Sequence, residues 1–335
     1  MAHRGDDALK VLVTGAFGTV GTQAVAELAA RGHQVRCMDL PTRANRRAAR
    51  YRRGNRSVSV LWGDVRDPAA VRAAVFGQDV VVHLASILPP MTSREPILAY
   101  QVNVEGTRNI VHAARDQMKP PRLAFASSVA VFGTNQQRQQ PRTADDPVQA
   151  TDAYSAHKLE GERLIRASGL RAVILRLGAV VPIRVATRDP REALRAMFEV
   201  PLDMPVECLH ARDAGTCLAN AVGSDAVWGR TLLIGGGPSC RIRHRDLVDA
   251  TMQASGVGKL PEQAFTLEPY YLHWMDTTDS QHLLDYQHTS FANHAAELHE
   301  SLRRRRALVT LLRPLARRFV LSHAAGHPEP ALVED

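Results

Sequence analysis

Close to the N-terminus of the chain, an apolar run is followed at once by three evenly spaced glycines. Val11 to Val13 predicts a buried strand, and Gly15, Gly18 and Gly21 come directly after it. A helix is then indicated by apolar residues at helical spacing: Val20, Ala24, Val25 and Leu28. Such glycines allow a tight turn, the close approach of a pyrophosphate, and close packing of helix against strand. The sequence therefore predicts that this helix N-terminus holds the phosphates of a dinucleotide.

An acidic residue strengthens this interpretation. The glycines follow the spacing GxxGxxG instead of GxGxxG, and a turn that binds no ligand is the alternative. About 20 residues further on, the apolar run Val35 to Met38 ends in Asp39, whose carboxylate can accept hydrogen bonds from an adenosine ribose. Because a carboxylate repels the additional phosphate of NADP, Asp39 favours NAD, while the nearby Arg43 leaves NADP open.

Further apolar runs alternate with helical segments. Asp67 is expected to cap a helix with Pro68 at its first position, and another helix is expected over 96–117. Strands are predicted over 58–61, 80–85, 123–126, 172–177 and 231–234. This alternation predicts an α/β fold, a doubly wound parallel Rossmann-type sheet with a smaller C-terminal substrate lobe. Three regions are expected: a nucleotide-binding domain over 1–182 with a returning strand near 231–237, a lobe mostly over 183–300, and a basic C-terminal helix and tail over 301–335.

The composition excludes several classes of protein. The 335 residues are 45% hydrophobic, but no apolar run is long enough for a transmembrane helix, and the polar residues 1–10 do not predict a signal peptide. The four cysteines show no spacing typical of a metal site or a disulfide framework. The net charge is +8, yet the arginines gather over 43–56 and 303–318 without interleaved aromatic residues that could stack on bases. We therefore expect a cytoplasmic protein with no bound metal and no nucleic-acid partner.

A tyrosine and a lysine one helical turn apart form the candidate catalytic pair. Asp152 is a plausible N-cap, so Tyr154 and Lys158 are expected on one face of a helix. A neighbouring ammonium favours the phenolate and is expected to lower the tyrosine pKa, which makes proton exchange with a substrate oxygen feasible. Ser128 follows a strand at the sheet edge where doubly wound folds place ligands, and could hold the substrate oxygen.

These motifs, in this order, resemble the extended short-chain dehydrogenase/reductase family, the branch with NAD-dependent epimerases and dehydratases. The resemblance covers about residues 10–300 and depends on several separate motifs: 14–21, Asp39, 63–65, 83–86, 103–107, 127–128, and Tyr154 with Lys158. It implies NAD as cofactor, a small-molecule substrate, and a homodimer formed through two helices of the large domain.

The resemblance also implies roles for individual residues. Asp64 would contact adenine, 84–86 would line the cofactor, and Asn103 would support the site from a helix. Lys158 would also hold the nicotinamide ribose, with hydride passing to or from a substrate carbon beside Tyr154. The full set of expected cofactor-binding residues is Gly15, Phe17, Gly18, Thr19, Val20, Gly21, Asp39, Asp64, Val65, Leu84, Ala85, Ser86, Asn103, Tyr154, Lys158 and Gly178.

Departures from the family pattern narrow the substrate. Sugar-nucleotide members place an asparagine that helps hold the diphosphate where this chain has Ala179, and burial of a diphosphate without donors would be costly. Val129 and Ala130 follow Ser128, where dehydratase and decarboxylase members place an acid. The apolar loop 87–91 predicts the wall of a pocket for an apolar or aromatic alcohol or ketone; packing between lobes is the alternative.

Three segments of the second half carry weaker signals. His210 to Asp213 resembles a family segment that leads from the lobe into a helix, with Asp213 as the cap. Residues 268–286, rich in Tyr and His, are a candidate cover for the substrate, with a role in the core as the alternative.

In the basic segment 302–320, several apolar residues between the arginines share one helical face: Leu308, Leu311 or Leu312, Leu315 and Phe319. This face would suit a membrane surface, but a helix docked on its own or a neighbouring subunit is the interpretation we favour.

Together these patterns predict an NAD-dependent oxidoreductase that interconverts a secondary alcohol and a ketone on a small substrate that is not linked to a nucleotide. Tyr154 is expected to be the acid/base, Lys158 to tune it, and Ser128 to orient the substrate oxygen. One alternative is an epimerase or dehydratase, including one for sugar nucleotides, in which tightly bound NAD is not consumed. A second is a nucleotide sensor without chemistry, although the complete set of three residues argues against it.

Overall fold

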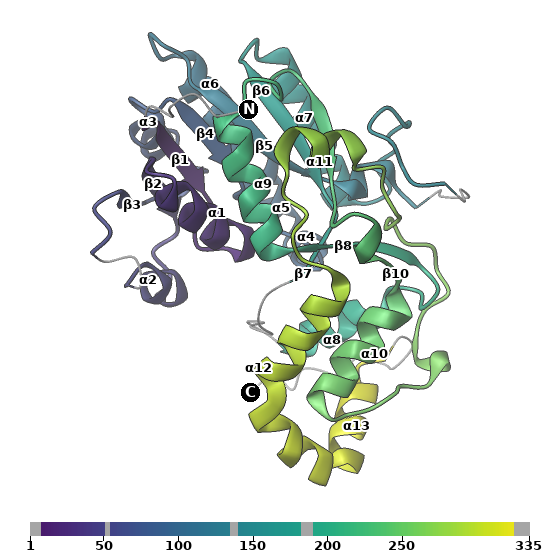
Figure 1. Ribbon diagram of the computed structural model, residues 1–335. Helices are drawn as coiled ribbons and strands as arrows, with labels where there is room; N and C mark the ends of the chain where they lie inside the picture. The colour runs from purple at the N-terminus through teal and green to yellow at the C-terminus, as the bar shows by residue number, and fades with distance from the viewer. Residues whose placement is uncertain (1–7, 51–53, 135–139, 182–189, 325–335) are drawn as a thin grey trace.

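The fold is built on a parallel sheet of seven strands (Figure 1). The computed structural model describes residues 8–50, 54–134, 140–181 and 190–324. The strand order is β3-β2-β1-β4-β5-β6-β9, and all neighbouring pairs are parallel. The strands are β1 (Lys10–Thr14), β2 (Gln34–Asp39), β3 (Val58–Trp62), β4 (Val80–His83), β5 (Arg122–Ser128), β6 (Ala172–Leu177) and β9 (Thr231–Ile234). The predicted doubly wound α/β fold is therefore confirmed.

Both faces of the sheet are covered by helices, which explains why its central strands are apolar almost throughout. Along β1, Val11 and Val13 pack into one core layer, whereas Leu12 packs into the other. The first layer lies under α1 (Thr19–Ala30) and α9 (Ala211–Gly223), which run side by side in Figure 1. The second lies under α3 (Pro68–Val75), α6 (Gly106–Arg115) and α7 (Ala153–Ala167).

Shorter helical segments complete the large domain. They are α2 (Arg43–Arg50), α4 (Met91–Arg94), α5 (Pro96–Tyr100) and a π-helical turn (Gln101–Glu105) that leads directly into α6. The predicted helix over 96–117 is thus one run in three parts. Asp67 caps α3 as expected, accepting a hydrogen bond from the backbone N–H of Ala69 at 2.8 Å.

The smaller lobe contains a second sheet of three strands and several helices. Its strands, in the order β10-β8-β7, are β7 (Ala179–Val181), β8 (Pro205–His210) and β10 (Arg241–Arg243). Its helices are α8 (Pro190–Phe198), α10 (His244–Ser255), α12 (Phe291–Leu311) and α13 (Arg313–Leu321), while α11 (Thr278–Leu284) packs near β9. Since β7 begins two residues after β6, the chain passes from the central sheet to the lobe at the edge where the strands end.

The cap of α9 differs from the expectation. The N-cap is His210, whose ring nitrogen accepts a hydrogen bond from the N–H of Arg212, so the prediction of Asp213 as the cap is wrong. Asp213 lies in the first turn, where its carboxylate accepts hydrogen bonds from the backbone N–H groups of His288 and Thr289. It therefore ties the start of α9 to the segment before α12.

The C-terminal region forms two helices instead of one continuous face. The break falls at Leu312, and Pro314 stands in the first turn of α13, where a missing N–H is tolerated. These helices dock on their own chain, with α12 along α10 and Val320 buried in the core of the lobe. No helix in the described parts of the chain has the length and apolar character needed to cross a bilayer.

Candidate active site

The glycine turn between β1 and α1 has a geometry that excludes larger residues. Gly15 has a φ of +64°, and a Cβ added there would lie 2.9 Å from the amide nitrogen of Ala85. A Cβ on Gly21 would collide with the carbonyl oxygen of Gly15. Gly18 is the N-cap of α1, and no side chain caps this helix. The first N–H groups of α1 are therefore available to an anion, as the cradle of a dinucleotide pyrophosphate requires.

This turn forms one wall of a cavity of about 660 Å³ at the edge where the parallel strands end. All of the residues predicted to bind the cofactor or to act in catalysis line this cavity, with Asn103 as the exception. They reach it from the ends of β1 to β6, from the first turn of α1 and from the first two turns of α7. The structure thus brings together residues from about 160 positions of sequence, from Gly15 to Gly178.

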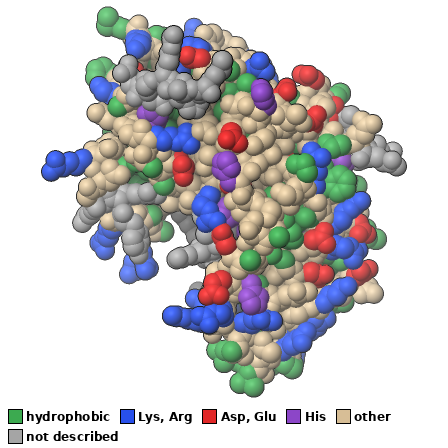
Figure 2. All heavy atoms as spheres, viewed as in Figure 1, with side chains coloured by type: hydrophobic (Ala, Val, Ile, Leu, Met, Phe, Trp, Pro, Cys, Tyr) green, Lys and Arg blue, Asp and Glu red, His purple; other side chains and the backbone are tan. Residues whose placement is uncertain are grey.

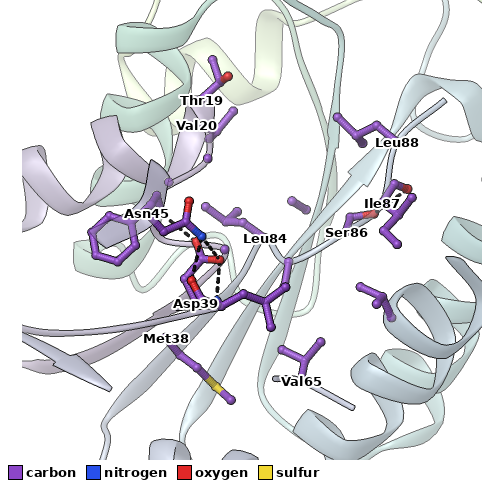
Figure 3. Close-up of a pocket in the computed structure, with 18 of the residues that line it drawn as sticks. Thr19, Val20, Met38, Asp39, Asn45, Val65, Leu84, Ser86, Ile87 and Leu88 are labelled. Atoms are coloured by element: carbon purple, nitrogen blue, oxygen red, sulfur yellow. Dashed lines mark hydrogen bonds between the residues drawn. The ribbon is translucent and has the colours of Figure 1, made fainter. Parts of the chain in front are cut away.

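Asp39 joins the end of β2 to the glycine turn. One oxygen of its carboxylate accepts a hydrogen bond from the N–H of Phe17 at 2.9 Å. The other accepts from the side-chain amide of Asn45 at 2.9 Å and from the N–H of Leu40 at 2.8 Å. Asn45, which sequence reasoning missed, also lines the cavity, and Figure 3 shows its amide bonded to the carboxylate at one side of the pocket. Arg43 is exposed at the start of α2 and is not part of the described cavity wall.

Asp64 and Asn103 fix two further loops around the cavity. Asp64 accepts hydrogen bonds from the guanidinium of Arg66 at 2.7 and 2.9 Å. Burial raises the pKa of the Asp64 carboxyl, but the contacts with Arg66 outweigh burial and lower this pKa overall.

Asn103 lies behind the cavity wall, in the π-helical turn. Its side chain accepts a hydrogen bond from the N–H of Ile87 at 2.7 Å and donates to the carbonyl of Ile87 at 2.9 Å. It also accepts from the hydroxyl of Ser86 at 3.1 Å, so this one amide holds the loop after β4.

Ser128, Tyr154 and Lys158 meet at the floor of the cavity. Asp152 and Ser155 form a capping box that starts α7 immediately before Tyr154. Tyr154 and Lys158 are therefore stacked on the face of α7 that covers β5, and only 8% and 5% of these residues are exposed. The Lys158 ammonium donates a hydrogen bond to the carbonyl of Ala126 at 2.8 Å and lies 5.7 Å from the centre of the Tyr154 ring.

The pKa values of Tyr154 and Lys158 shift in directions that are set mainly by burial. Burial raises the pKa of Tyr154 to about 12, although a hydrogen bond with Ser128 works against this rise. Burial also lowers the pKa of Lys158 to about 8, because a desolvated ammonium is disfavoured. The expectation that Lys158 lowers the pKa of Tyr154 is therefore wrong for this structure. The ammonium is directed to the Ala126 carbonyl, and desolvation of the phenol dominates.

A buried ion-pair network lies next to this floor. Glu162, one turn after Lys158 on α7, accepts two hydrogen bonds from the guanidinium of Arg176, both at 2.9 Å. It also accepts from the hydroxyl of Ser127 at 2.6 Å and from Arg166 at 2.8 Å. Because Ser127 belongs to β5 and Arg176 to β6, the network fixes α7 on the two strands that carry the site.

The end of the cavity opposite Asp39 is mainly apolar. Figure 3 shows Ile87 and Leu88 across the pocket from Asp39 and Asn45. The expected apolar wall over 87–91 is thus partly present. Leu98, Val102, Leu177 and Val180 are further apolar residues that line the cavity.

The segment expected to cover the substrate divides into two parts. The rings of Tyr270 and Tyr271 are stacked with centres 4.2 Å apart, their hydroxyls are hydrogen-bonded at 2.9 Å, and both rings lie close enough to Tyr154 to interact electrostatically. Tyr286 is instead fully buried in the core, with its hydroxyl accepting a hydrogen bond from the N–H of Gly235. Neither Tyr270 nor Tyr271 is among the described residues that line the cavity, so a covering role for the first part of this segment stays a prediction, whereas Tyr286 belongs to the fold.

Comparison with known proteins agrees with this arrangement. The sequence profile of the NAD dependent epimerase/dehydratase family matches residues 11–200, more than half of the chain. The chain is 28% identical over 195 residues to a 3-beta-hydroxysteroid dehydrogenase of Mycolicibacterium neoaurum, covering 57% of this chain and 51% of that protein. It is 27% identical over 243 residues to D-erythronate dehydrogenase of Cupriavidus necator, covering 64% of this chain and 72% of that protein.

Solved structures show the same fold. UDP-glucuronic acid 4-epimerase of Bacillus cereus, in complex with UDP-glucuronic acid and NAD, superposes with a TM-score of 0.73 at 20% identity, covering 88% of this chain and 99% of that one. The chain spans about half the length of the first curated relatives that it matches. The resemblance to the extended short-chain dehydrogenase/reductases is confirmed, and the chain belongs to the NAD dependent epimerase/dehydratase family.

Proposed function

We propose that this protein is an NAD-dependent dehydrogenase that interconverts a secondary alcohol and a ketone on a small, largely apolar substrate. One observation carries the proposal. Ser128, Tyr154 and Lys158 share the floor of one cavity, and the wall beyond them is apolar, with Ile87 and Leu88 opposite the Asp39 end. Polar groups at the reacting oxygen and apolar walls around the rest of the substrate are the usual composition of a small-molecule site.

The cofactor fits the other half of the cavity. The uncapped start of α1 would hold the pyrophosphate, and Asp39 would accept hydrogen bonds from the adenosine ribose. NAD, when bound, supplies the hydride acceptor or donor of the reaction. A 2′-phosphate would meet the Asp39 carboxylate, which Asn45 fixes at 2.9 Å, so NAD is preferred to NADP.

The chain's own residues would handle the proton. Tyr154 is protonated at neutral pH, and burial, which raises its pKa from 10 to about 12, strengthens this preference, so it can donate that proton to a ketone oxygen. Ser128 and Tyr154 line the same cavity, and Ser128 is near enough to lower the pKa of Tyr154, so both hydroxyls can orient one substrate oxygen. In the oxidation direction the same phenol must act as a base, and the positive charge on Lys158 would favour its ionised form.

The substrate side favours a molecule without a diphosphate. Ala179 stands where sugar-nucleotide members place an asparagine, and the described wall at this point is formed by Gly178 and Val180. One of the dehydrogenases named above acts, by its name, on a hydroxysteroid, which is an apolar ring system that bears a hydroxyl group. We infer that an apolar ring bearing a hydroxyl or keto group suits this pocket better than a sugar nucleotide.

The test is an absorbance assay of the nicotinamide with purified protein. We expect NAD to be reduced with hydroxysteroids or other apolar secondary alcohols, and not with UDP-hexoses. Conversion of a UDP-hexose to its epimer without a net change in NADH would support the epimerase alternative and contradict the proposal. NAD binding without turnover on either panel would support a sensor.

The matched variant is Tyr154→Phe. Loss of the phenol hydroxyl should lower kcat about 10²- to 10⁴-fold, the usual contribution of a positioned acid/base, while calorimetry should show NAD affinity within a few-fold of the wild type. Near-normal turnover of this variant would exclude the proton-transfer role of Tyr154.

A further inference from the structure

A cluster of exposed apolar side chains lies where α12 meets α13. We call it the α12–α13 tip, and it consists of Leu308, Leu311, Leu312, Leu315 and Phe319. Each of these residues is between 45% and 78% exposed. In Figure 1 the junction of α12 and α13 lies at the end of the molecule furthest from the central sheet, and Figure 2 shows hydrophobic side chains gathered at that end.

The tip is separate from the face that holds these helices in the fold. Val309 and Ala316 are partly buried, and Val320 is buried, against the lobe core that contains Phe198 and Met252. Arg313 donates a hydrogen bond to the carbonyl of Val257 at 3.0 Å and so anchors the start of α13. The lobe is therefore closed by the opposite face, and the tip contributes large apolar residues that the described fold does not use.

Positive charge surrounds the tip. Residues 301–324 include seven arginines and no Asp or Glu. Arg304 and Arg305 precede Leu308 by four and three residues and so lie on its side of α12, while Arg318 lies three residues after Leu315 on α13. All three are exposed, and within the described part of the chain their guanidinium groups make neither a hydrogen bond nor an ion pair.

We propose that the α12–α13 tip binds the surface of an anionic lipid membrane, with its leucines and Phe319 in the headgroup region and its arginines on the lipid phosphates. Exposed leucines beside unpaired arginines are the two signals that peripheral attachment requires. A second copy of the chain is a poorer occupant, because a twofold contact would bring Arg304, Arg305 and Arg318 of both copies to one apolar interface. The contact is peripheral, since none of the described helices could cross a bilayer.

The experiment is vesicle co-sedimentation with the full-length protein. The probes are vesicles of phosphatidylcholine alone and of phosphatidylcholine mixed with phosphatidylglycerol. We expect the wild type to sediment with the anionic vesicles only, and added salt to release it. Leu311→Glu with Leu315→Glu should lower the affinity at least about tenfold, and Arg304→Ser with Arg305→Ser should do the same, because both signals are needed.

Two controls test whether a loss of vesicle binding is specific to the α12–α13 tip. Met118→Glu, at a fully exposed residue of the large domain, should bind vesicles like the wild type. All variants should unfold at the temperature of the wild type, because the substituted side chains are exposed. The proposal is overturned if the wild type ignores anionic vesicles, if it binds neutral vesicles equally well, or if Leu311→Glu with Leu315→Glu still binds. It is also overturned if the wild type is a dimer that this double substitution converts to a monomer.

Discussion

Lys158 places an amine in the floor of the cavity at a cost in stability that depends on pH. Burial lowers its pKa from the ordinary 10.5 to about 8. Between these two values the unfolded chain holds a proton on this side chain that the folded chain has released, so the free energy of unfolding rises with pH across this window. A shift of this size corresponds to about 3 kcal/mol, the full penalty being present below pH 8.

Lys158→Met removes this titration and keeps most of the apolar stem. Across the window from about pH 8 to 10.5, the stability of the wild type relative to the variant should rise by about 3 kcal/mol. At neutral pH the variant should be the more stable protein, by less than this amount, because the lysine's hydrogen bond to Ala126 is worth about 1.5–3 kcal/mol and is lost. The variant should also lose turnover.

The assay is urea unfolding followed by circular dichroism at a series of pH values, without added nucleotide. Lys119→Met, at an exposed lysine whose side chain is 90% accessible, is the matched control and should leave the pH dependence unchanged. A stability difference between the wild type and Lys158→Met that stays constant, or falls, from pH 8 to 10.5 would show that burial does not depress this amine's pKa.

Three further predictions follow from the same site. Asn103→Ala frees Ser86 and the backbone of Ile87, so kcat should fall about tenfold or more and NAD affinity, measured by calorimetry, should weaken as well; a variant with both values unchanged would contradict this. Glu162→Gln leaves the Arg176 guanidinium buried without its counter-charge, which should cost about 3–5 kcal/mol in urea unfolding; a loss below 1 kcal/mol would contradict this. Because burial raises the pKa of Tyr154 to about 12, the phenol stays protonated around neutral pH, so the pH profile of ketone reduction should show no loss of rate from titration of the phenol near neutrality; such a loss, absent in Tyr154→Phe, would oppose this assignment.

Much of the site could be predicted because it follows from the sheet. The glycine turn, Asp39 and Ser128 each come directly after an apolar run, and the carboxyl ends of parallel strands meet at one edge. Tyr154 and Lys158 could be placed because four residues make one helical turn. Local patterns of this kind are sufficient to place site residues when the strand order and the helix period fix where their side chains lie.

Other site residues carry no such local signal. Asn45 reaches Asp39 from a short helix, and its pattern is that of any exposed polar residue. Tyr270 and Tyr271 approach Tyr154 from a loop more than 100 positions away, and a loop has no periodicity from which to infer a direction. Pro314 gives the helix break near Leu312 a local signal, but which side of α12 and α13 packs against the lobe has none. The tip could therefore be recognised as apolar and basic but not divided into a buried and an exposed face.

The pKa of Tyr154 shows why spacing alone cannot give the electrostatics of a site. One turn of helix brings Lys158 next to the phenol, but its ammonium donates to the carbonyl of Ala126, and burial acts on both groups. Each group is shifted toward its neutral form, because desolvation disfavours both phenolate and ammonium. The folded chain therefore holds a protonated acid beside an amine that loses its own charge near pH 8, an arrangement suited to donating a proton to a ketone. Oxidation of an alcohol would instead require the charge of Lys158 to stabilise the phenolate, so the two directions of the proposed reaction make opposite demands on this pair.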